Sequence, residues 1–447
     1  MKKVITYGTY DLLHEGHLNL LRRAKELGDY LIVGVTSDSF DQERGKLNVH
    51  NNVLERIQAI KDTGFADEVI IEEHIGQKID DIQFHQIDVF AIGSDWEGKF
   101  DYLKEYCEVV YLPRTEGISS TMLRAGKDRV FKLGIIGSGR IANRFVPEAR
   151  YVSRVEVVSI YNPDSSEAFE FKQRFGLNES HSDLSEFYKN IDAVYIASPH
   201  LTHYEYIKSS LLNGKHVLCE IPLCLKGEEA KEVYELAKSR NLVLLEACKT
   251  AFCPAFLHLV RIIKSGIIGD VVDVQASLSK LVDRSMREFN GSEAGGSITE
   301  LSPLPLMVIL KLLGRKIKNV TYYSLFENDV DIFTKGIFTF SGAVASITIG
   351  LGVKTEGNLV VSGTKGYLYV PSPWWKTEYF EIRYEDQNNN RKFYYHFAEE
   401  GLRYEIQEFI SMIAGQRTST YKMKAEESIT IADIIECFRK GENLTRL

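Results

Sequence analysis

Two glycine-containing turns, each between an apolar run and a helix pattern, constrain the fold of this chain most. GTYDLLHEGH (residues 8–17) follows the apolar run at 3–7, and GSGRIA (residues 137–142) follows the run at 131–136. A buried strand that turns through glycine into a helix is the usual opening of a doubly wound α/β sheet. Two such openings in 447 residues predict two successive nucleotide-binding-type units.

The remaining hydrophobic patterns extend both units and add a third region. Strand-like runs alternate with helix patterns, at 30–36, 68–71, 88–92 and 109–112, and again at 155–160, 193–197, 216–219 and 243–246. After residue 254, period-2 runs such as VVDVQASLSKL and AVASITIGL indicate a mostly antiparallel sheet with one open face, and residues from about 405 to 440 indicate helices. We therefore predict an α/β protein of three domains: a doubly wound domain at 1–129, a Rossmann domain at 130–253, and an α/β domain at 254–447 with a mostly antiparallel sheet.

Composition narrows the class of partner. The net charge of −8 argues against a general nucleic-acid or membrane-surface binder, and no apolar run approaches the ~20 residues that span a bilayer. Six cysteines form no CxxC pair, so we expect reduced thiols, no protein-bound metal cluster and a cytoplasmic location. Open sheet faces lead us to expect a homo-oligomer, a dimer or larger.

The first glycine turn carries two histidines at the start of its helix. In His14-x-Gly16-His17, glycine permits close backbone approach to a phosphate, and the helix N-terminus presents free N–H groups and a positive dipole end. Two imidazoles at this position can stabilise the charge that develops on a phosphoryl group during displacement. The alternative is a turn that carries surface histidines, which the strand-turn-helix context disfavours.

The segment RTEGISST (residues 114–121) follows the last strand of the same unit, at the sheet edge where ligands of open α/β folds bind. Arg114 can bind phosphate bidentately, and Ser119 can cap the next helix while it faces the anion. Together the two segments indicate a phosphate-binding site.

Residues from about 1 to 125 resemble the glycerol-3-phosphate cytidylyltransferase family, through GDYLIVGVTSD, GSDWEGKFDYL and CEVVYLPRTEGISST as well as the histidine turn. The resemblance implies a nucleotidyltransferase domain that binds CTP, with Mg²⁺ carried by the triphosphate rather than held in a protein cage. It implies catalytic roles for His14, His17, Lys46 and Arg114, where Lys46 lies on a loop that closes on phosphates. The CTP-binding set that it implies is Gly8, Thr9, Tyr10, Asp11, His14, His17, Arg56, Arg114, Thr115 and Ser119.

Two departures from that family lie on the acceptor side of the site. Gly64 stands near a position where the family carries arginine, and the loop DQERGKLN is poorer in lysine than the family's loop. They leave cytidylyl transfer in place and leave the acceptor, a sugar or polyol phosphate, open.

The second glycine turn is a G-x-G-x-x-A dinucleotide fingerprint. Gly137 makes the turn, Gly139 admits the pyrophosphate, and Ala142 lets helix and strand pack closely. Asn162 stands where an acid would hold the ribose 2′-OH of NADH, so its neutral side chain favours NADPH, although no arginine follows it directly and both coenzymes stay open. The predicted NAD(P)-binding residues are Gly137, Ser138, Gly139, Arg140, Ile141, Asn162, Ser198, Pro199, His203 and Glu220.

Residues from about 131 to 440 resemble the glucose–fructose oxidoreductase/inositol dehydrogenase family, through GIIGSGRIA, DAVYIASPHLTH, NGKHVLCEIPL, LLEACKTAFCPAF and GGSITELSP. That family places a lysine in an EKP turn, and a histidine after the double glycine, as acid/base groups beside the nicotinamide. Here those positions hold Ile221 and Leu304. We expect the proton donor to have moved to Lys249, just past the next strand; His200, His203 and Glu300 each have a structural and a functional interpretation.

The two resemblances together imply consecutive steps. We expect cytidylyl transfer from CTP to a sugar phosphate, with a ketose phosphate such as fructose 6-phosphate as the preferred guess, together with NAD(P)H-dependent reduction of its carbonyl. The product would be a CDP-alditol for a surface polysaccharide or capsule. The alternative is a monofunctional cytidylyltransferase with a non-catalytic dinucleotide-fold module.

Overall fold

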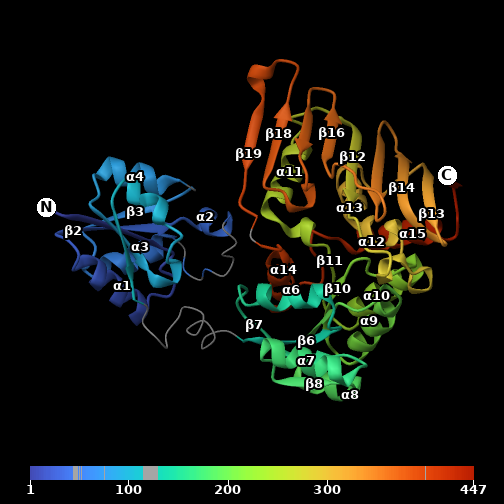
Figure 1. The fold of residues 1–447 in the computed structure, drawn as a ribbon, viewed down its shortest axis with the longest axis horizontal. Helices are drawn as coiled ribbons and strands as arrows, with labels where there is room; N and C mark the ends of the chain where they lie inside the picture. The colour runs from blue at the N-terminus through green and yellow to red at the C-terminus, as the bar shows by residue number, and fades with distance from the viewer. Residues whose placement is uncertain (44–48, 50, 52, 75, 114–128, 398) are drawn as a thin grey trace. The chain divides into compact units, whose positions relative to one another are not determined.

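The computed structural model describes residues 1–43, 49, 51, 53–74, 76–113, 129–397 and 399–447, in two compact units (Figure 1). Met1–Val130 with Val152–Arg154 form the first unit, and Phe131–Tyr151 with Val155–Leu447 form the second. Each unit is described by itself.

The first unit is a five-stranded sheet in which every neighbouring pair is parallel, in the order β3-β2-β1-β4-β5. Every predicted strand forms, within two residues of its expected bounds. The strands are β1 (Lys3–Gly8), β2 (Tyr30–Thr36), β3 (Glu68–Glu72), β4 (Val89–Gly93) and β5 (Glu108–Leu112), and the helices are α1 (Glu15–Lys25), α2 (Asp38–Glu43), α3 (Val53–Asp62) and α4 (Gln77–His85). The doubly wound prediction for this unit is confirmed.

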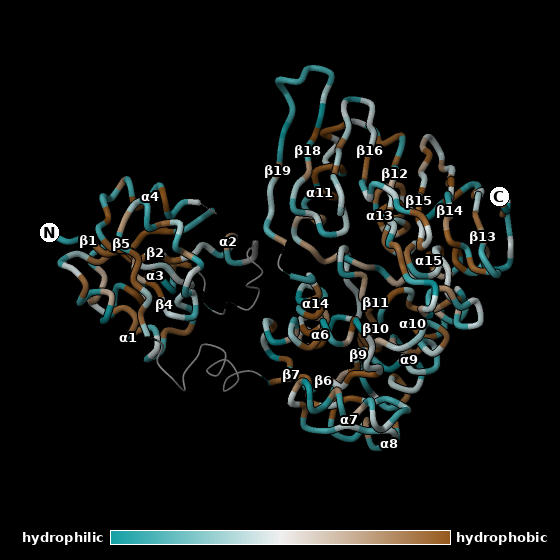
Figure 2. The backbone as a smooth tube through the Cα atoms, in the orientation of Figure 1, coloured by the Kyte–Doolittle hydropathy of each residue, from teal (hydrophilic) through white to brown (hydrophobic). Residues whose placement is uncertain are grey.

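Both faces of this sheet are covered, which explains why its strands are apolar without alternation. On β2, Leu31 and Val33 pack into a cluster on one face, while Ile32, which lies between them, packs into a cluster on the other. Figure 2 shows the same pattern in colour, since the brown apolar stretches run along the strands and the teal polar stretches lie in the connections.

The second unit begins with a six-stranded parallel sheet in the order β11-β10-β9-β6-β7-β8. Its strands are β6 (Phe131–Ile136), β7 (Val155–Tyr161), β8 (Glu179–His181), β9 (Ala193–Ile196), β10 (His216–Glu220) and β11 (Leu244–Ala247), and its helices are α6 (Arg140–Ala149), α7 (Ser165–Phe175), α8 (Leu184–Phe187), α9 (His203–Leu212) and α10 (Gly227–Ser239). The chain order reverses between β6 and β9. Ligands of such sheets bind at this switch point, outside the carboxyl ends of the strands.

The same unit continues into a nine-stranded sheet in the order β19-β18-β17-β16-β12-β15-β14-β13-β20. Neighbours are antiparallel except for the β12/β15 and β13/β20 pairs, so the predicted mostly antiparallel sheet is confirmed. The strands are β12 (Val271–Ser279), β13 (Asn319–Glu327), β14 (Val330–Thr339), β15 (Val344–Gly350), β16 (Leu359–Gly363), β17 (Tyr367–Val370), β18 (Tyr379–Arg383), β19 (Arg391–Tyr394) and β20 (Leu444–Arg446).

The helices of this last part are α11 (Pro254–Lys264), α12 (Ser297–Leu301), α13 (Pro303–Leu313), α14 (Leu402–Ala414) and α15 (Ala425–Arg439). Helix α13 is buried along most of its length and packs against β12 and α15. Among the described residues no single helix is long and apolar enough to cross a membrane, although Gly291–Leu301 and Pro303–Leu313, a pair bent by 43°, together satisfy the length and composition criteria.

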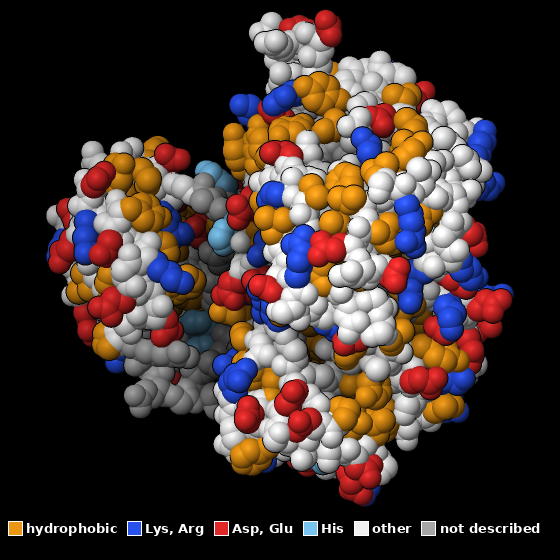
Figure 3. All heavy atoms as spheres, turned by 45° about the vertical axis from the view of Figure 1, so that its right-hand side comes forward, with side chains coloured by type: hydrophobic (Ala, Val, Ile, Leu, Met, Phe, Trp, Pro, Cys, Tyr) orange, Lys and Arg blue, Asp and Glu red, His pale blue; other side chains and the backbone are white. Residues whose placement is uncertain are grey.

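The surface of the second unit mixes side chains of all classes. Figure 3 shows one face, on which hydrophobic side chains lie among basic and acidic ones. Several exposed large hydrophobic residues lie on strands of the nine-stranded sheet, namely Val272, Tyr323, Leu325, Val344, Tyr367 and Tyr394.

Candidate active sites

The first candidate site is the loop between β1 and α1. Tyr10 and Leu12 have positive φ angles of 52° and 46°, a conformation that non-glycine residues rarely adopt. The buried Tyr10 ring folds back over Gly8, where an added Cβ would lie 2.9 Å from the ring. Strained backbone of this kind is concentrated where a loop must present groups to a ligand.

His14 and His17 lie at the start of α1, as predicted. The Nδ1 of His14 accepts a hydrogen bond from the backbone N–H of Gly16 at 3.1 Å, so this imidazole is the N-cap of the helix. The two rings stack with centroids 3.9 Å apart and planes 22° apart, and the His17 ring meets Tyr10 edge-on. Because Nδ1 of His14 is an acceptor, its N–H lies on Nε2.

Arg56, predicted to bind CTP, has a different role in the structure. Its side chain is 1% exposed; it donates to the carbonyl oxygen of Thr9 at 2.8 Å and to Asp41 at 3.1 Å, and it pairs with Asp38. A guanidinium whose donors are used in this way fixes the position of the loop. The structure thus gives Arg56 a positioning role, and its direct contact with CTP stays a prediction.

Two other predicted residues, Thr9 and Asp11, join this network. The hydroxyl of Thr9 donates to Asp41 at 2.8 Å, and the buried Asp11 accepts from the backbone N–H of Asn51 at 2.9 Å. These contacts fix the loop to α2 through Thr9 and to the segment just before α3 through Asp11. Lys46, Arg114, Thr115 and Ser119 lie outside the described residues.

The second candidate site begins at the turn between β6 and α6. Gly137 has φ +99°, and an added Cβ would lie 2.5 Å from the carbonyl oxygen of Ala197. Gly139 is the N-cap of α6, and a Cβ built there meets nothing within 4 Å. The open space beside a helix N-terminus is where a pyrophosphate binds in this fold.

An acid that the sequence analysis did not single out, Glu167, lies next to the end of β7. The side-chain amide of Asn162 donates to Oγ of Ser138 at 2.7 Å and to the carboxylate of Glu167 at 2.8 Å, and Ser138 donates to the same carboxylate at 2.6 Å. Glu167 lies on the first turn of α7, five residues after Asn162. An acid therefore stands beside Asn162, but it is carried by a helix and not by the strand end that usually carries it in such folds.

A cavity of about 900 Å³ collects the predicted coenzyme residues in one cleft. All ten of them line it, from Gly137 to Glu220, together with Ile221. His203 also braces the cleft from within, because its two ring nitrogens lie 2.9 Å from the carbonyl oxygens of Pro222 and Ser198. Glu220 accepts a hydrogen bond from the hydroxyl of Tyr195 at 2.5 Å, and burial raises its pKa.

Lys249, the predicted proton donor, does not line this cleft. Its Nζ donates to the carbonyl oxygen of Glu400 at 3.0 Å and lies 3.7 Å from the Glu400 carboxylate. Lys249 lies at the predicted sheet edge, but its ammonium group contacts Glu400, in the segment before α14, and does not line the cleft. The expected role of Lys249 as acid is therefore not supported by its position.

The charged and polar side chains that line the cleft include His200, Arg287 and Glu300, which lie close together. Nη2 of Arg287 lies 2.9 Å from Oε1 of Glu300, and Nδ1 of His200 lies 3.6 Å from the same oxygen. Burial, opposed in part by Arg287, raises the pKa of Glu300 to about 7. Burial, followed by His203, Arg287 and Arg439, holds the pKa of His200 well below its ordinary value.

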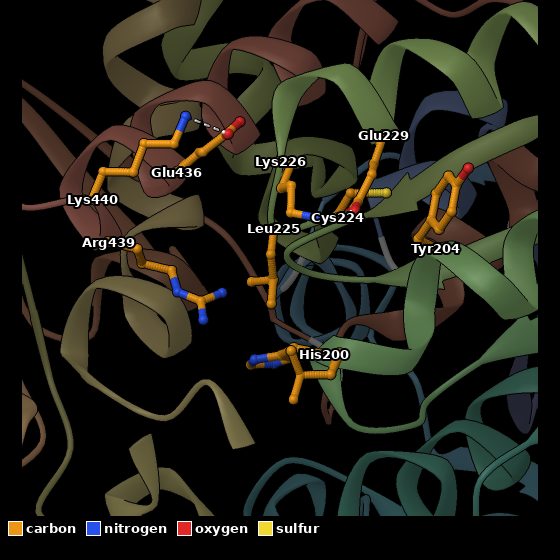
Figure 4. A pocket seen from close by; sticks show the side chains of 10 residues that line it. His200, Tyr204, Cys224, Leu225, Lys226, Glu229, Glu436, Arg439 and Lys440 are labelled. Carbon is orange, nitrogen blue, oxygen red and sulfur yellow. Dashed lines mark hydrogen bonds and ion pairs between the residues drawn. The ribbon is translucent and has the colours of Figure 1, made fainter. Parts of the chain in front are cut away.

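His200 also lines a second cavity, of about 340 Å³, with Tyr204, Lys226, Arg439 and other residues (Figure 4). In Figure 4 the guanidinium of Arg439 points toward the space above the His200 ring, while Lys440 pairs with Glu436 at 2.7 Å. His200 is thus the wall that the two cavities share.

Among the described residues, no group of three His, Cys, Asp or Glu side chains has the arrangement of a metal site. The described part of the first site offers imidazoles and a helix N-terminus, which suit phosphate oxygens better than a divalent cation.

Comparison with known proteins now gives the family. Residues 5–126 match the cytidylyltransferase-like model, residues 131–247 the oxidoreductase family with an NAD-binding Rossmann fold, and residues 256–369 the GFO/IDH/MocA C-terminal domain. Glycerol-3-phosphate cytidylyltransferase of Bacillus subtilis (strain 168) is 57% identical over 125 residues, which are 28% of this chain and 95% of that protein. The chain is a cytidylyltransferase fused to a GFO/IDH/MocA oxidoreductase.

Relatives of the oxidoreductase part are more distant. Trans-1,2-dihydrobenzene-1,2-diol dehydrogenase of Sus scrofa is 28% identical over 325 residues, which cover 70% of the fusion protein and 97% of the relative. A 3-ketoreductase from Actinomadura kijaniata, solved with NADP and TDP-benzene, has a TM-score of 0.65 at 22% identity and covers 71% of the fusion protein and all of its own chain. Levoglucosan dehydrogenase, solved with NADH and levoglucosan, has a TM-score of 0.63 at 20% identity, with 70% and 98% covered. The oxidoreductase domain is an NAD(P)-binding fold.

Proposed function

We propose that the fusion protein is a bifunctional enzyme that makes a CDP-linked polyol. The cytidylyltransferase domain transfers CMP from CTP to a sugar phosphate: an acceptor phosphate oxygen attacks the α-phosphorus, and the bond to pyrophosphate breaks. The oxidoreductase domain reduces the carbonyl of the sugar to an alcohol. The observation that carries this proposal is the pairing, in one chain, of a phosphate-facing histidine turn with a coenzyme cleft that holds buried acid/base groups.

Each residue set has a defined task in this proposal. His14 and His17 at the start of α1 stabilise charge on the phosphates, and Arg56 fixes the loop that presents them. Arg114, Thr115, Ser119 and Lys46 remain proposed phosphate contacts. Mg²⁺ would be bound mainly by the triphosphate and water. When bound, NAD(P)H supplies the hydride, and the residues of the cleft orient it and move a proton.

The fusion itself favours a carbonyl-bearing acceptor, because glycerol 3-phosphate has nothing to reduce. A ketose phosphate such as fructose 6-phosphate would give a CDP-hexitol, suited to a surface polysaccharide or capsule. We propose NADH as the preferred coenzyme, since the Glu167 carboxylate can accept from ribose hydroxyls and would repel a 2′-phosphate. The domain bounds 1–129, 130–253 and 254–447, the cytoplasmic location and the homo-oligomer remain part of the proposal.

The competing function is a cytidylyltransferase with a non-catalytic second module. It is favoured by the apolar residues Ile221 and Leu304, where the resemblance places acid/base groups. A mixture of CTP, one sugar phosphate and the full chain distinguishes the two functions, with pyrophosphate release and NAD(P)H absorbance recorded together across a panel of ketose and aldose phosphates. Coupled consumption of both substrates supports the bifunctional enzyme. Pyrophosphate release without any NADH or NADPH oxidation across the panel would establish the scaffold alternative.

A further inference from the structure

Three buried polar atoms in the coenzyme cleft have no hydrogen-bond partner among the described residues. They are Nδ1 of His200, Oε1 of Glu300 and Nη1 of Arg287, and they come from three separate elements. Glu300 Oε1 forms a close ion pair with Arg287 Nη2 at 2.9 Å, outside the angular limits of a hydrogen bond, and His200 Nδ1 lies 3.6 Å from the same oxygen, beyond hydrogen-bond distance. The ion pair therefore leaves His200 Nδ1 and Arg287 Nη1 without a partner among the described residues.

Such an arrangement is costly unless a ligand completes it. A buried polar group without a partner costs about 1–3 kcal/mol, and native interiors contain few of them. A ligand oxygen atom that accepts a hydrogen bond from Arg287 and a proton from Glu300 would give both side chains a partner. The carbonyl oxygen of a sugar has this chemistry, because it is an acceptor before hydride transfer and takes a proton as it becomes a hydroxyl.

We propose that Glu300 is the proton donor of the carbonyl reduction, with Arg287 and His200 as the residues that hold the carboxyl group and the substrate oxygen. This inference rests on the proposed reductase function. Hydride from NAD(P)H forms a C–H bond at the carbonyl carbon, the C=O π pair moves onto oxygen, and that oxygen takes the proton of the Glu300 carboxyl. The Glu300 carboxylate that remains is stabilised by Arg287 and regains a proton from solvent.

The local charges suit this role. Glu300 on α12 faces Arg287 and Glu288 from the segment before α12, Lys280 just past β12 and His200 from the Rossmann sheet edge. Arg287 and Lys280 favour its carboxylate, whereas burial and Glu288 favour the protonated form. With a pKa of about 7, Glu300 is protonated below neutral pH and about half protonated at neutral pH, and it loses the proton as the pH rises above that value.

The other candidates in the region are occupied or apolar. Lys249 is bound to Glu400, and Glu220 accepts a hydrogen bond from Tyr195. Ile221 and Leu304 cannot donate a proton. The backbone explains how Glu300 reaches the cleft: a Cβ at Gly295 would lie 2.5 Å from the carbonyl oxygen of Glu288, so only glycine lets α12 approach so closely.

The test compares Glu300→Gln with wild type in the full chain. Glu300→Gln keeps the size of the side chain and removes the transferable proton, so we expect kcat for NAD(P)H oxidation to fall by at least about 100-fold, with pyrophosphate release and coenzyme affinity unchanged. Glu300→Asp should restore part of the rate. Glu293→Gln, in the same segment but outside the cleft, is the matched control and should behave as wild type.

The pH profile is the second readout. Wild-type kcat should decrease about tenfold per pH unit above the pKa of Glu300, and Glu300→Gln should lose this dependence. A Glu300→Gln variant with wild-type kcat and pH profile would overturn the assignment, all the more if Lys249→Ala abolished reduction. Wild-type protein that oxidises no NADH or NADPH with any sugar phosphate would instead refute the proposed reductase function, and the proton-donor role with it.

A third readout needs neither coenzyme nor substrate. Infrared difference spectra of wild type minus Glu300→Gln, recorded across the pH range, should show a protonated carboxyl band that disappears above neutral pH. If the spectra instead show a carboxylate band at every pH above the ordinary pKa of glutamate, Glu300 is ionised in the cleft, and its role as acid is overturned.

Discussion

Glu148 at the end of α6 and Arg403 at the start of α14 form a buried, bidentate ion pair, with Nε–Oε2 and Nη2–Oε1 distances of 2.9 and 3.0 Å. The backbone N–H of Arg403 also donates to Glu148, and the guanidinium lies 3.9 Å from the centre of the Tyr151 ring. The helix whose N-terminus faces the coenzyme is therefore anchored at its other end to the C-terminal helical segment.

Arg403→Met should leave the Glu148 carboxylate buried and unpaired, at a cost of about 3–5 kcal/mol. Hydrogen exchange in the full chain should show lost protection in α6 and α14. Glu148→Gln combined with Arg403→Met should restore part of it. Arg284→Met removes another bidentate Arg–Glu pair, with Glu327, but that arginine is 59% exposed, so its loss should change protection little. Equal effects of the two arginine variants would contradict the anchoring role.

Glu167→Gln should change the coenzyme preference. Removal of the negative charge beside Asn162 and Ser138 lowers the repulsion of a 2′-phosphate, so affinity for NADPH relative to NADH should rise about tenfold, the ratio that 1.4 kcal/mol produces. Fluorescence titration of both coenzymes measures the ratio. Glu186→Gln, whose carboxylate pairs with Lys189 away from the cleft, should leave it unchanged. An unchanged ratio in Glu167→Gln would remove Glu167 from coenzyme selection.

His14→Asn separates the two roles of that residue. Asparagine can cap α1 as His14 does, so the helix should keep its stability, whereas His14→Ala should lose about 1 kcal/mol. Both variants lack the imidazole, so pyrophosphate release should fall by about 10²–10³-fold in each. Full activity in His14→Asn would mean that the side chain serves only as a cap. Coenzyme binding should stay normal in both and confirms that the second unit is folded.

Gly296→Ala should disable the reductase through the position of α12. At φ +126° an added Cβ would lie 2.2 Å from Oδ1 of Asp331, which also accepts from the backbone N–H of Ile298 on α12 at 2.9 Å. The substitution must move either Asp331 or the helix that carries Glu300, so we expect reduction to be lost. Gly314→Ala is the control, since Gly314 also has positive φ but open space around it, and should cost about 1 kcal/mol without loss of activity. Normal reduction by Gly296→Ala would show that α12 tolerates the shift.

The fold could be predicted largely from the sequence, because its signals are local. Runs such as 30–36 and 131–136 are strongly apolar and flanked by turn residues, and their strands match the prediction residue for residue. The coenzyme loop was equally predictable, since the backbone conformation and the close approach of Ala197 require glycine at position 137, and Gly139 completes the local motif.

The roles of single polar side chains were less predictable, because their partners are distant in sequence. Lys249 lies at the expected edge, but its partner Glu400 is 151 residues away. Arg56 donates a hydrogen bond to the carbonyl oxygen of Thr9, which is 47 residues away in sequence. For Glu167 the sequence did contain a signal. Asn162 stands where an acid is usual, and the first turn of the helix that follows β7 carries Glu167.

The position of Glu167 on a helix affects how such an enzyme can change its coenzyme. Asn162 belongs to the end of a buried strand, whereas Glu167 lies on the surface of α7 and contributes little to the core. With Glu167 in the proposed role, coenzyme choice is separated from the residues that keep the sheet folded. We then expect a single substitution on the helix surface to redirect the enzyme between the cell's two pools of reducing coenzyme, while the stability of the domain is preserved.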